Sequence, residues 1–230
     1  MVGVNFKEVG QPSGDVQELI APAGLVGIDW SDFSSRDQLM VWDPVSQGYP
    51  VFYSWTGPDG DLMMPGLSDK WIDLGAFDGT IPEITLPVGG AFWISTESVS
   101  AAVTSIGEVK EDATNVPLKA GLNMIACTLP VDVNLNNDAK IVFNGLDGIN
   151  WGDFSSRDQL MIWDATSQGY PVFYSWTGAD GDSMMPGLSN KWIDLGTFDG
   201  TIPTITLPVN GAAWIVRTTG TAASIDIPGL

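Results

Sequence analysis

Short runs of alternating apolar and polar residues recur along this chain of 230 residues. In its first half, strand-like runs cover Gly3–Val9, Gln38–Trp42, Tyr49–Trp55, Lys70–Leu74, Glu83–Leu86 and Ala91–Ser95. Turn residues separate them, and strands at spacings of about 8–12 residues favour an all-β sandwich or barrel. With 27 Gly and 15 Pro in the chain, no helical period continues for long. No helix is therefore predicted beyond one turn near Asp32–Asp37.

The same pattern returns 121 positions later. Aligning Asp29–Thr96 with Asn150–Arg217 gives 68 pairs, of which 14 differ and 54 are identical. The aligned stretch holds all ten tryptophans, five in each copy. This indicates a tandem duplication, with module 1 at residues 1–109, a linker at 110–118 and module 2 at 119–230. The predicted fold class is all-β, with two homologous β-sandwich or β-barrel-like domains.

Composition narrows the possible functions. The chain has 9 Lys and Arg against 28 Asp and Glu, a net charge of −19, and lacks the basic stripe that nucleic-acid phosphates require. It has no histidine, which excludes His-based catalysis and His-ligated zinc. The one cysteine, Cys127, lies in an apolar run and is interpreted as a small buried hydrophobe. No apolar run predicts a membrane span, and Met1–Asn5 do not have the form of a signal peptide.

A pair of aspartates in each copy is the candidate metal site, with Asp59 and Asp61 repeated as Asp180 and Asp182. Each pair flanks a glycine in a predicted loop, and spaced carboxylates and carbonyls in such a loop are ligands that Ca²⁺ takes. The full calcium-loop pattern with its distal Glu is missing, so a plain Asx turn is the alternative interpretation. The sequence requires no cofactor, and calcium is the candidate ion.

The carboxylates do not single out a catalytic pair. Candidates for glycoside hydrolysis are Asp43, Asp59, Asp61, Asp73 and Asp78. Nothing in the sequence raises the pKa of one above another, and there is no P-loop, dinucleotide fingerprint or nucleophile elbow. Arg36 and Arg157, in identical runs, are predicted to form ion pairs with a neighbouring aspartate. The chain is predicted not to be an enzyme.

The tryptophans admit two interpretations. Trp42, Trp71 and Trp93 lie in strand runs beside aliphatic residues, where an indole anchors the core of a small β domain. One stretch in each copy instead combines aromatic and methionine side chains into a candidate exposed patch for a protein or a sugar. The residues of this patch are Trp55, Met63 and Met64 in module 1 and Trp176, Met184 and Met185 in module 2.

Each module carries short motifs in a fixed order, namely GLNxIxxxLP at 121–130, QLMxWD, a Tyr- and Trp-rich hairpin, and IPxITLPxGGAFWI. This order resembles the tandem β modules of secreted bacterial surface proteins. Such repeats commonly open with a G-W-N-L strand and close with P-G-x-G-F-W-I, and Leu122 stands where that pattern has Trp. The resemblance implies an extracellular, structural or adhesive role without catalysis, and it carries over no functional residues.

The leading hypothesis is an extracellular or cell-surface structural protein that assembles with copies of itself into a filament, sheet or coat. Near-identical modules favour it, because head-to-tail contacts that do not close give filaments. The alternative is a carbohydrate-binding or adhesive module, in which exposed tryptophans at equivalent places contact glycans. The predicted partners are therefore copies of the chain or glycans, with no nucleic acid and no membrane span.

Overall fold

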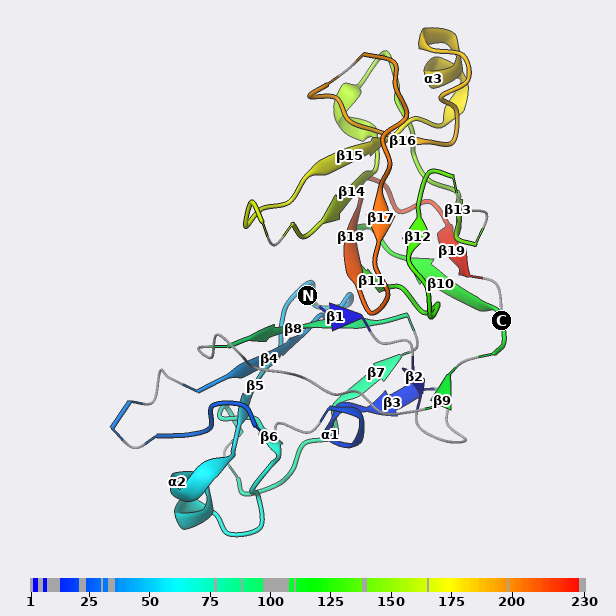
Figure 1. The fold of residues 1–230 in the computed structure, drawn as a ribbon. Helices are drawn as coiled ribbons and strands as arrows, with labels where there is room; N and C mark the ends of the chain where they lie inside the picture. Colours follow the sequence, from blue (N-terminus) through cyan, green and yellow to red (C-terminus); the bar gives the residue numbers. More distant parts are fainter. Residues whose placement is uncertain are drawn as a thin grey trace.

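The computed structural model describes residues 2–3, 6–7, 13–20, 24–29, 31–32, 36–76, 78–87, 89–96, 108–109, 111–137, 140–164, 166–197 and 199–227. Most of its regular structure is antiparallel β-sheet, which confirms the all-β expectation (Figure 1). The first half holds β1 (Val2–Gly3), β2 (Phe6–Lys7), β3 (Ser13–Asp15), β4 (Gln38–Val41), β5 (Val51–Ser54), β6 (Trp71–Ile72), β7 (Thr85–Pro87), β8 (Ala91–Ser95) and β9 (Glu108–Val109). The second half holds β10 (Thr114–Leu118), β11 (Gly121–Ala126), β12 (Val133–Asn134), β13 (Val142–Asn144), β14 (Gln159–Ile162), β15 (Val172–Ser175), β16 (Trp192–Ile193), β17 (Thr206–Leu207), β18 (Ala212–Arg217) and β19 (Ala223–Ile227).

The two halves contain central sheets of the same topology. The strand order is β1-β8-β4-β5-β6 in one and β11-β18-β14-β15-β16 in the other. Their registers correspond, because Leu39 pairs with Ile94 as Leu160 pairs with Ile215. Burial alternates along β4 and β5, as the sequence pattern predicts for strands with one face on a core. A three-stranded sheet of order β10-β19-β13 adds to the second half.

Two boundaries differ from the predicted ones. The single strand expected at Gly3–Val9 is two short strands, β1 and β2, which pair with β8 and β9 respectively. The predicted linker at 110–118 contains β10, which pairs with β19 along its whole length. This pairing places β10 with module 2, because its hydrogen bonds go to that module's last strand. The two modules are therefore joined by residues 110–113.

The prediction of no helix beyond a single turn is wrong. The helices are α1 (Val16–Leu19), α2 (Gly57–Met63), α3 (Gly178–Met184) and the 3-10 turn η1 (Phe154–Ser156). The Gly-rich compositions of α2 and α3 disfavour a helix locally, and tertiary contacts override that preference. The Trp55 indole Nε1 donates to the Gly60 carbonyl at 3.0 Å, and Trp176 does the same to Gly181 at 3.0 Å. A Cβ at Gly181 would lie 2.9 Å from the Trp176 carbonyl oxygen, so glycine allows this close approach.

Each module has its own apolar core. In module 1 it gathers Leu39, Phe52, Trp71 and Phe92 from the central sheet with α1. In module 2 the corresponding core also includes residues of β10 and β19, so the three-stranded sheet covers one of its faces. Cys127 is buried in this second core, which confirms the interpretation of the cysteine as a small hydrophobe.

A buried amide side chain holds the same two backbone groups in each module. In module 1, Gln17 donates to the Trp71 carbonyl at 2.6 Å and accepts from the Trp71 amide at 3.0 Å. In module 2, Asn136 donates to the Trp192 carbonyl at 2.9 Å and accepts from the Trp192 amide at 2.8 Å. Different residues thus satisfy equivalent backbone groups at β6 and β16, which would otherwise be buried without partners.

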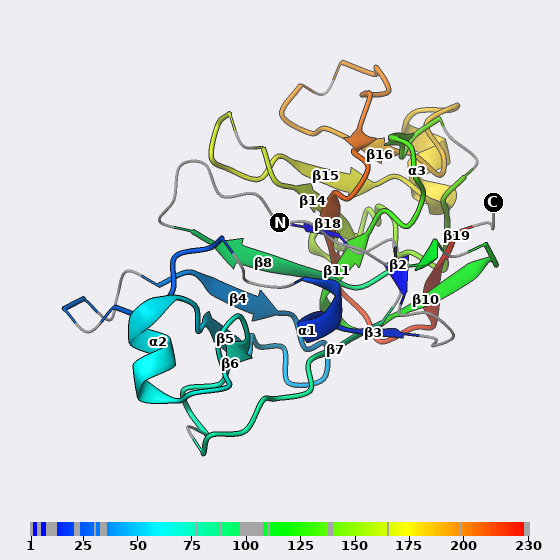
Figure 2. The same ribbon diagram turned by 60° about the horizontal axis from the view of Figure 1, so that its bottom comes forward.

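The two central sheets lie against each other around β8 and β11. Strand β11 contacts both β8 and β1 of the other half. Figures 1 and 2, two views of the same ribbon, place α2 and α3 at opposite ends of the molecule, away from this contact. Equivalent elements of the two modules therefore point away from a shared centre.

Candidate functional site

The predicted exposed patch is corrected by the position of its tryptophans. Trp55 and Trp176 are both 0% exposed and form the centres of small apolar clusters beneath α2 and α3. Each of the two indoles donates its N–H to the helix that covers it. These two rings are core residues and offer no platform for a sugar or a protein.

The methionines of the predicted patch pack in the same places. Met64 is half-buried against the Trp55 cluster, and Met184 and Met185 are half-buried against the Trp176 cluster. The side chain of Met63 lies outside the described residues. The described methionines thus complete the small clusters and do not form a separate surface.

The candidate calcium ligands lie on α2 and α3. Asp59 is half-buried in the first turn of α2, and the side chain of Asp61 lies outside the described residues. Asp180 accepts a hydrogen bond from the Trp151 amide at 2.8 Å, while Asp182 is exposed. Among the side chains that the structure describes, no group of three or more acidic or thiol residues is placed to hold a metal ion. Calcium binding stays a prediction.

Six aromatic side chains instead meet between the two modules. Trp42 and Tyr49 of module 1 lie 4.9 Å apart and contact Trp214 of β18, with ring centroids 5.0 and 6.0 Å away. All three contacts are edge-on, which is a favourable arrangement for aromatic rings. Trp214 and Trp42 are buried there, while Tyr49 remains partly exposed.

The same arrangement occurs with the modules interchanged. Trp163 and Tyr170 of module 2 lie 5.1 Å apart and contact Trp93 of β8, with centroids 5.6 and 6.2 Å away. These residues are the 121-position counterparts of Trp42, Tyr49 and Trp214. A contact in which each side supplies the same residues to the other is isologous, as in a twofold dimer. Here the twofold relation lies within one chain.

Polar contacts across this interface go to the main chain of β11 and of the turn before β8. The Gln47 side chain accepts from the Leu122 amide at 2.8 Å and donates to the Leu122 carbonyl at 3.2 Å. The Trp42 indole also donates to that carbonyl at 3.2 Å, and the Ala126 amide donates to the Gly89 carbonyl at 2.9 Å. Such contacts fix the register of the two modules and satisfy strand groups that would otherwise face the interface.

Tyr49 is electrostatically distinct at this interface. Burial is the larger influence and the neighbouring Tyr170 the smaller one, and together they raise the pKa of Tyr49 to about 12. Burial also raises the pKa of Tyr170. Both phenols are therefore held in the neutral form, since a phenolate would be poorly solvated there.

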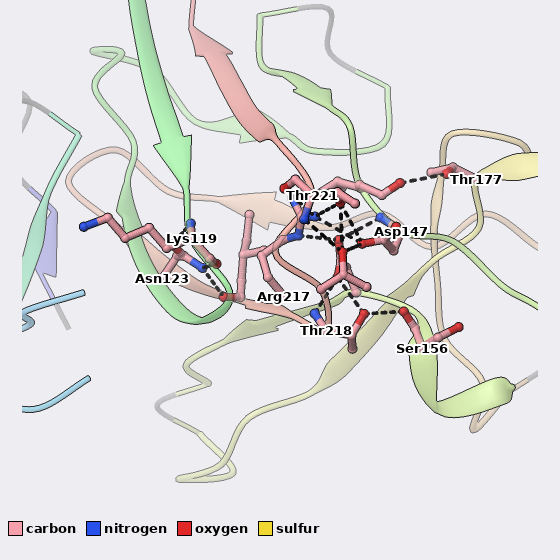
Figure 3. A network of polar contacts seen from close by, with 12 residues as sticks. Lys119, Asn123, Asp147, Ser156, Thr177, Arg217, Thr218 and Thr221 are labelled. Carbon is pink, nitrogen blue, oxygen red and sulfur yellow. Dashed lines mark hydrogen bonds and ion pairs between the residues drawn. The ribbon is translucent and has the colours of Figure 1, made fainter. Parts of the chain in front are cut away.

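A second polar centre occurs in module 2 (Figure 3). Arg217, at the end of β18, has a fully buried side chain whose Nε lies 2.8 Å from Asp158 and whose Nη2 lies 3.1 Å from Asp147. Nη2 also donates to Thr221 Oγ1 at 2.9 Å, and the Thr218 amide donates to Asp158 at 2.9 Å. These contacts tie the chain after β18 to the loop before β14.

Asp158 experiences opposing effects within this network. Burial is the largest and raises its pKa, while hydrogen bonds from the Thr218 and Asp147 amides and the charge of Arg217 lower it. The cation therefore offsets part of the cost of burying a carboxylate.

The two arginines predicted to pair with aspartates contact aromatic rings. The guanidinium carbon of Arg36 lies 4.3 Å from the centre of the Tyr53 ring, and that of Arg157 lies 4.4 Å from the centre of the Tyr174 ring. Both are cation–π contacts at equivalent places in the two modules. They attach both arginines to the central sheets.

An exposed aromatic pair lies near α3. Trp151 is 51% exposed and Phe154 is 47% exposed, with ring centroids 5.8 Å apart. The Asp180 carboxylate holds the Trp151 backbone amide, so this loop is attached to the helix. Their sequence counterparts, Trp30 and Phe33, lie outside the described residues. Sequence reasoning missed Trp151 as an exposed aromatic residue, although its neighbours Asn150, Gly152 and Asp153 distinguish it from tryptophans in apolar strands.

A cavity of about 640 Å³ lies between the modules beside the aromatic interface. Its lining is mainly apolar and includes Phe52, Leu86 and Met124, with Asp43 and Lys119 among the charged residues. The Asp43 carboxylate accepts from the Val45 amide at 2.8 Å and is committed to its own turn. The turn at Asp43 thus fixes the position of this carboxylate at the cavity.

No family model, curated protein or solved structure matches this chain. Among the helices of the described residues, none has both the length and the apolar character needed to cross a membrane. The resemblance to bacterial surface modules stays an expectation from the sequence.

Proposed function

We propose that the protein is a structural protein of the cell exterior whose two β-sandwich-like modules arose by tandem duplication, and that it assembles with copies of itself into a filament, sheet or coat. The observation that carries this proposal is the reciprocal aromatic interface. It joins the modules about a pseudo-twofold relation and directs equivalent elements, α2 and α3, to opposite ends (Figure 2). A unit with two like ends extends in a line when each end contacts another molecule.

The exposed pair Trp151 and Phe154 is the proposed contact at the module 2 end. Aromatic anchors dominate the binding energy of many protein interfaces, and a ring that is half-exposed in the single chain has surface left to bury. The sequence repeats both residue types at Trp30 and Phe33, which lie outside the described residues. The acidic surface, with a net charge of −19, opposes close approach at low salt, and cations would screen that repulsion.

The test is electron microscopy with light scattering of the native chain and of Trp151→Ala/Phe154→Ala over a range of concentrations, with Ca²⁺ chelated and at millimolar level. We expect regular assemblies from the native chain and at least a roughly tenfold higher assembly concentration for the variant, since one anchor contributes more than about 1.4 kcal/mol. Val142→Ser/Ile202→Ser, at other exposed apolar positions of module 2, is the matched control. If the native chain stays monomeric in every condition, the proposal is wrong.

The second candidate function is adhesion through carbohydrate binding. It is favoured by the exposed ring of Trp151, which replaces the buried Trp55 and Trp176 as the sugar platform. On a glycan array, this function predicts binding by the native chain and loss of binding by Trp151→Ala at an unchanged melting temperature. Equal binding by the native chain and the variant would remove Trp151 from that role.

A further inference from the structure

We infer that the aromatic face that joins the two modules of one chain also joins modules of different chains, so that module 1 of one molecule docks on module 2 of a second copy. The inference deepens the proposed self-assembly and rests on it for its biological role. Its occupant is a second copy of this chain, and its contacts are those already present within each molecule.

The first argument is the self-complementarity of the face. Module 1 supplies Trp42 and Tyr49 as one half and Trp93 as the other, and module 2 supplies the counterparts of all three. An isologous surface is complementary to its own copy, so every module carries what is needed to dock on another. A contact between chains would therefore reproduce the same ring pairs without any new surface.

The second argument is that the polar contacts recognise backbone. Gln47 and Trp42 bind the amide and carbonyl of Leu122, and the Gly89 carbonyl binds the Ala126 amide. These contacts need a strand at the right register and no particular side chain on it. The β11 strand of another molecule presents the same groups.

The third argument is the length of the connection. Strand β9 ends at Val109 and pairs with β2, while β10 begins at Thr114 and pairs with β19. Residues 110–113 are the hinge between these two anchored strands, and four extended residues span at most about 14 Å. The closed and exchanged forms contain the same interfaces, so hinge strain and effective concentration decide between them.

The balance between the closed and the exchanged form therefore depends on protein concentration. For a short flexible linker the effective concentration is on the order of millimolar, so dilute chains close on themselves. At higher concentrations exchange becomes competitive. Two chains that exchange reciprocally give a closed dimer, and chains that exchange in succession give an open polymer.

Exchange is tested by energy transfer within one chain. A donor fluorophore and an acceptor fluorophore are attached to the cysteines of Leu62→Cys on α2 and Ser183→Cys on α3. Both positions are exposed, while the native Cys127 is buried. A small, constant amount of this doubly labelled chain is mixed with increasing amounts of unlabelled native chain. Exchange separates the two labelled modules, so we expect the transfer efficiency to fall as the unlabelled concentration rises. Association through the molecular ends leaves the efficiency unchanged.

Hinge variants give an independent readout by light scattering. Deleting residues 111–113 prevents closure and is expected to convert monomers to dimers or larger species. Inserting six Gly and Ser residues after 112 relaxes the hinge and is expected to raise the concentration for exchange several-fold.

If the transfer efficiency stays constant at all concentrations and hinge length does not change the oligomeric state, the inference is overturned. Filaments seen in the same samples would still support self-assembly. If the efficiency falls but no assemblies form, the exchange stands and the proposed function fails.

Discussion

The two modules differ most where their central sheets end. In module 2, Arg217 binds both Asp158 and Asp147, whereas the corresponding positions of Arg217 and Asp147 in module 1 are Thr96 and Val26. The central aspartate itself is common to both modules. Asp37 accepts from the Val26 amide at 2.9 Å, just as Asp158 accepts from the Asp147 amide at 2.8 Å.

This difference shows which part of the network the fold needs. Both modules keep the buried carboxylate that holds the loop backbone, and at two further positions module 2 has the charged residues Arg217 and Asp147 where module 1 has Thr96 and Val26. Arg217 and Asp147 are both present in module 2, and both positions are uncharged in module 1. The ion pairs of module 2 are therefore an addition to a shared backbone contact.

The largest predicted effect follows from breaking this network one residue at a time. Arg217→Thr introduces the module 1 residue but leaves Asp158 and Asp147 without their cation, and we expect a loss of about 3–5 kcal/mol in the free energy of unfolding. Arg217→Thr/Asp147→Val reproduces module 1 at both positions and should recover part of that loss. Urea unfolding measures both, with Thr96→Ser at the exposed module 1 position as the control. A double variant as unstable as the single one would contradict the comparison.

A smaller effect is predicted at the buried amides. Gln17→Ala and Asn136→Ala each leave a buried backbone amide and carbonyl without partners, which costs about 1–3 kcal/mol. Because the two side chains serve equivalent groups, we expect similar losses, each localised by hydrogen exchange to its own module at the Trp71 or Trp192 amide. Gln17→Asn should also lose stability relative to the native chain. Asparagine has the shorter side chain, and in module 1 it would start from a different backbone position than Asn136 does in module 2. Full stability of that variant would show that the reach of the side chain does not matter.

These amides also show where prediction from sequence stops. Strand Ala91–Ser95 is predicted and observed with the same bounds, because a short apolar and aromatic run that follows turn residues is a local pattern. Gln17 and Asn136 lie in the segments that diverge between the copies, outside the aligned 121-position repeat. Their equivalence becomes visible only when β6 and β16 are in place, because it is defined by the backbone groups they bind.

The aromatic site was predictable in composition but not in pairing. The repeat indicates that Trp42 and Trp93 have counterparts, and their strand positions favour a buried role. Which ring meets which across the modules depends on how two sheets dock, and a local pattern carries no information on docking. Trp55 was misassigned for the same reason, since the helix that covers it forms against its local composition.

The smallest predicted effect concerns the titration of the two tyrosines of the interface. The pKa of Tyr49 is raised in the folded chain to about 12, against about 10 for an unfolded tyrosine, so the stabilising contribution is complete below pH of about 10 and is lost between about 10 and 12. Tyr49→Phe removes this titration, and its stability should decline less than that of the native chain over the same range in urea unfolding. Tyr170→Phe should act in the same direction, because burial raises the pKa of Tyr170 as well. Buried Cys127 also has a raised pKa and contributes to alkaline loss in every variant, so the informative quantity is the difference from the native chain. Identical alkaline profiles for Tyr49→Phe and the native chain would show that the titrating group is not Tyr49.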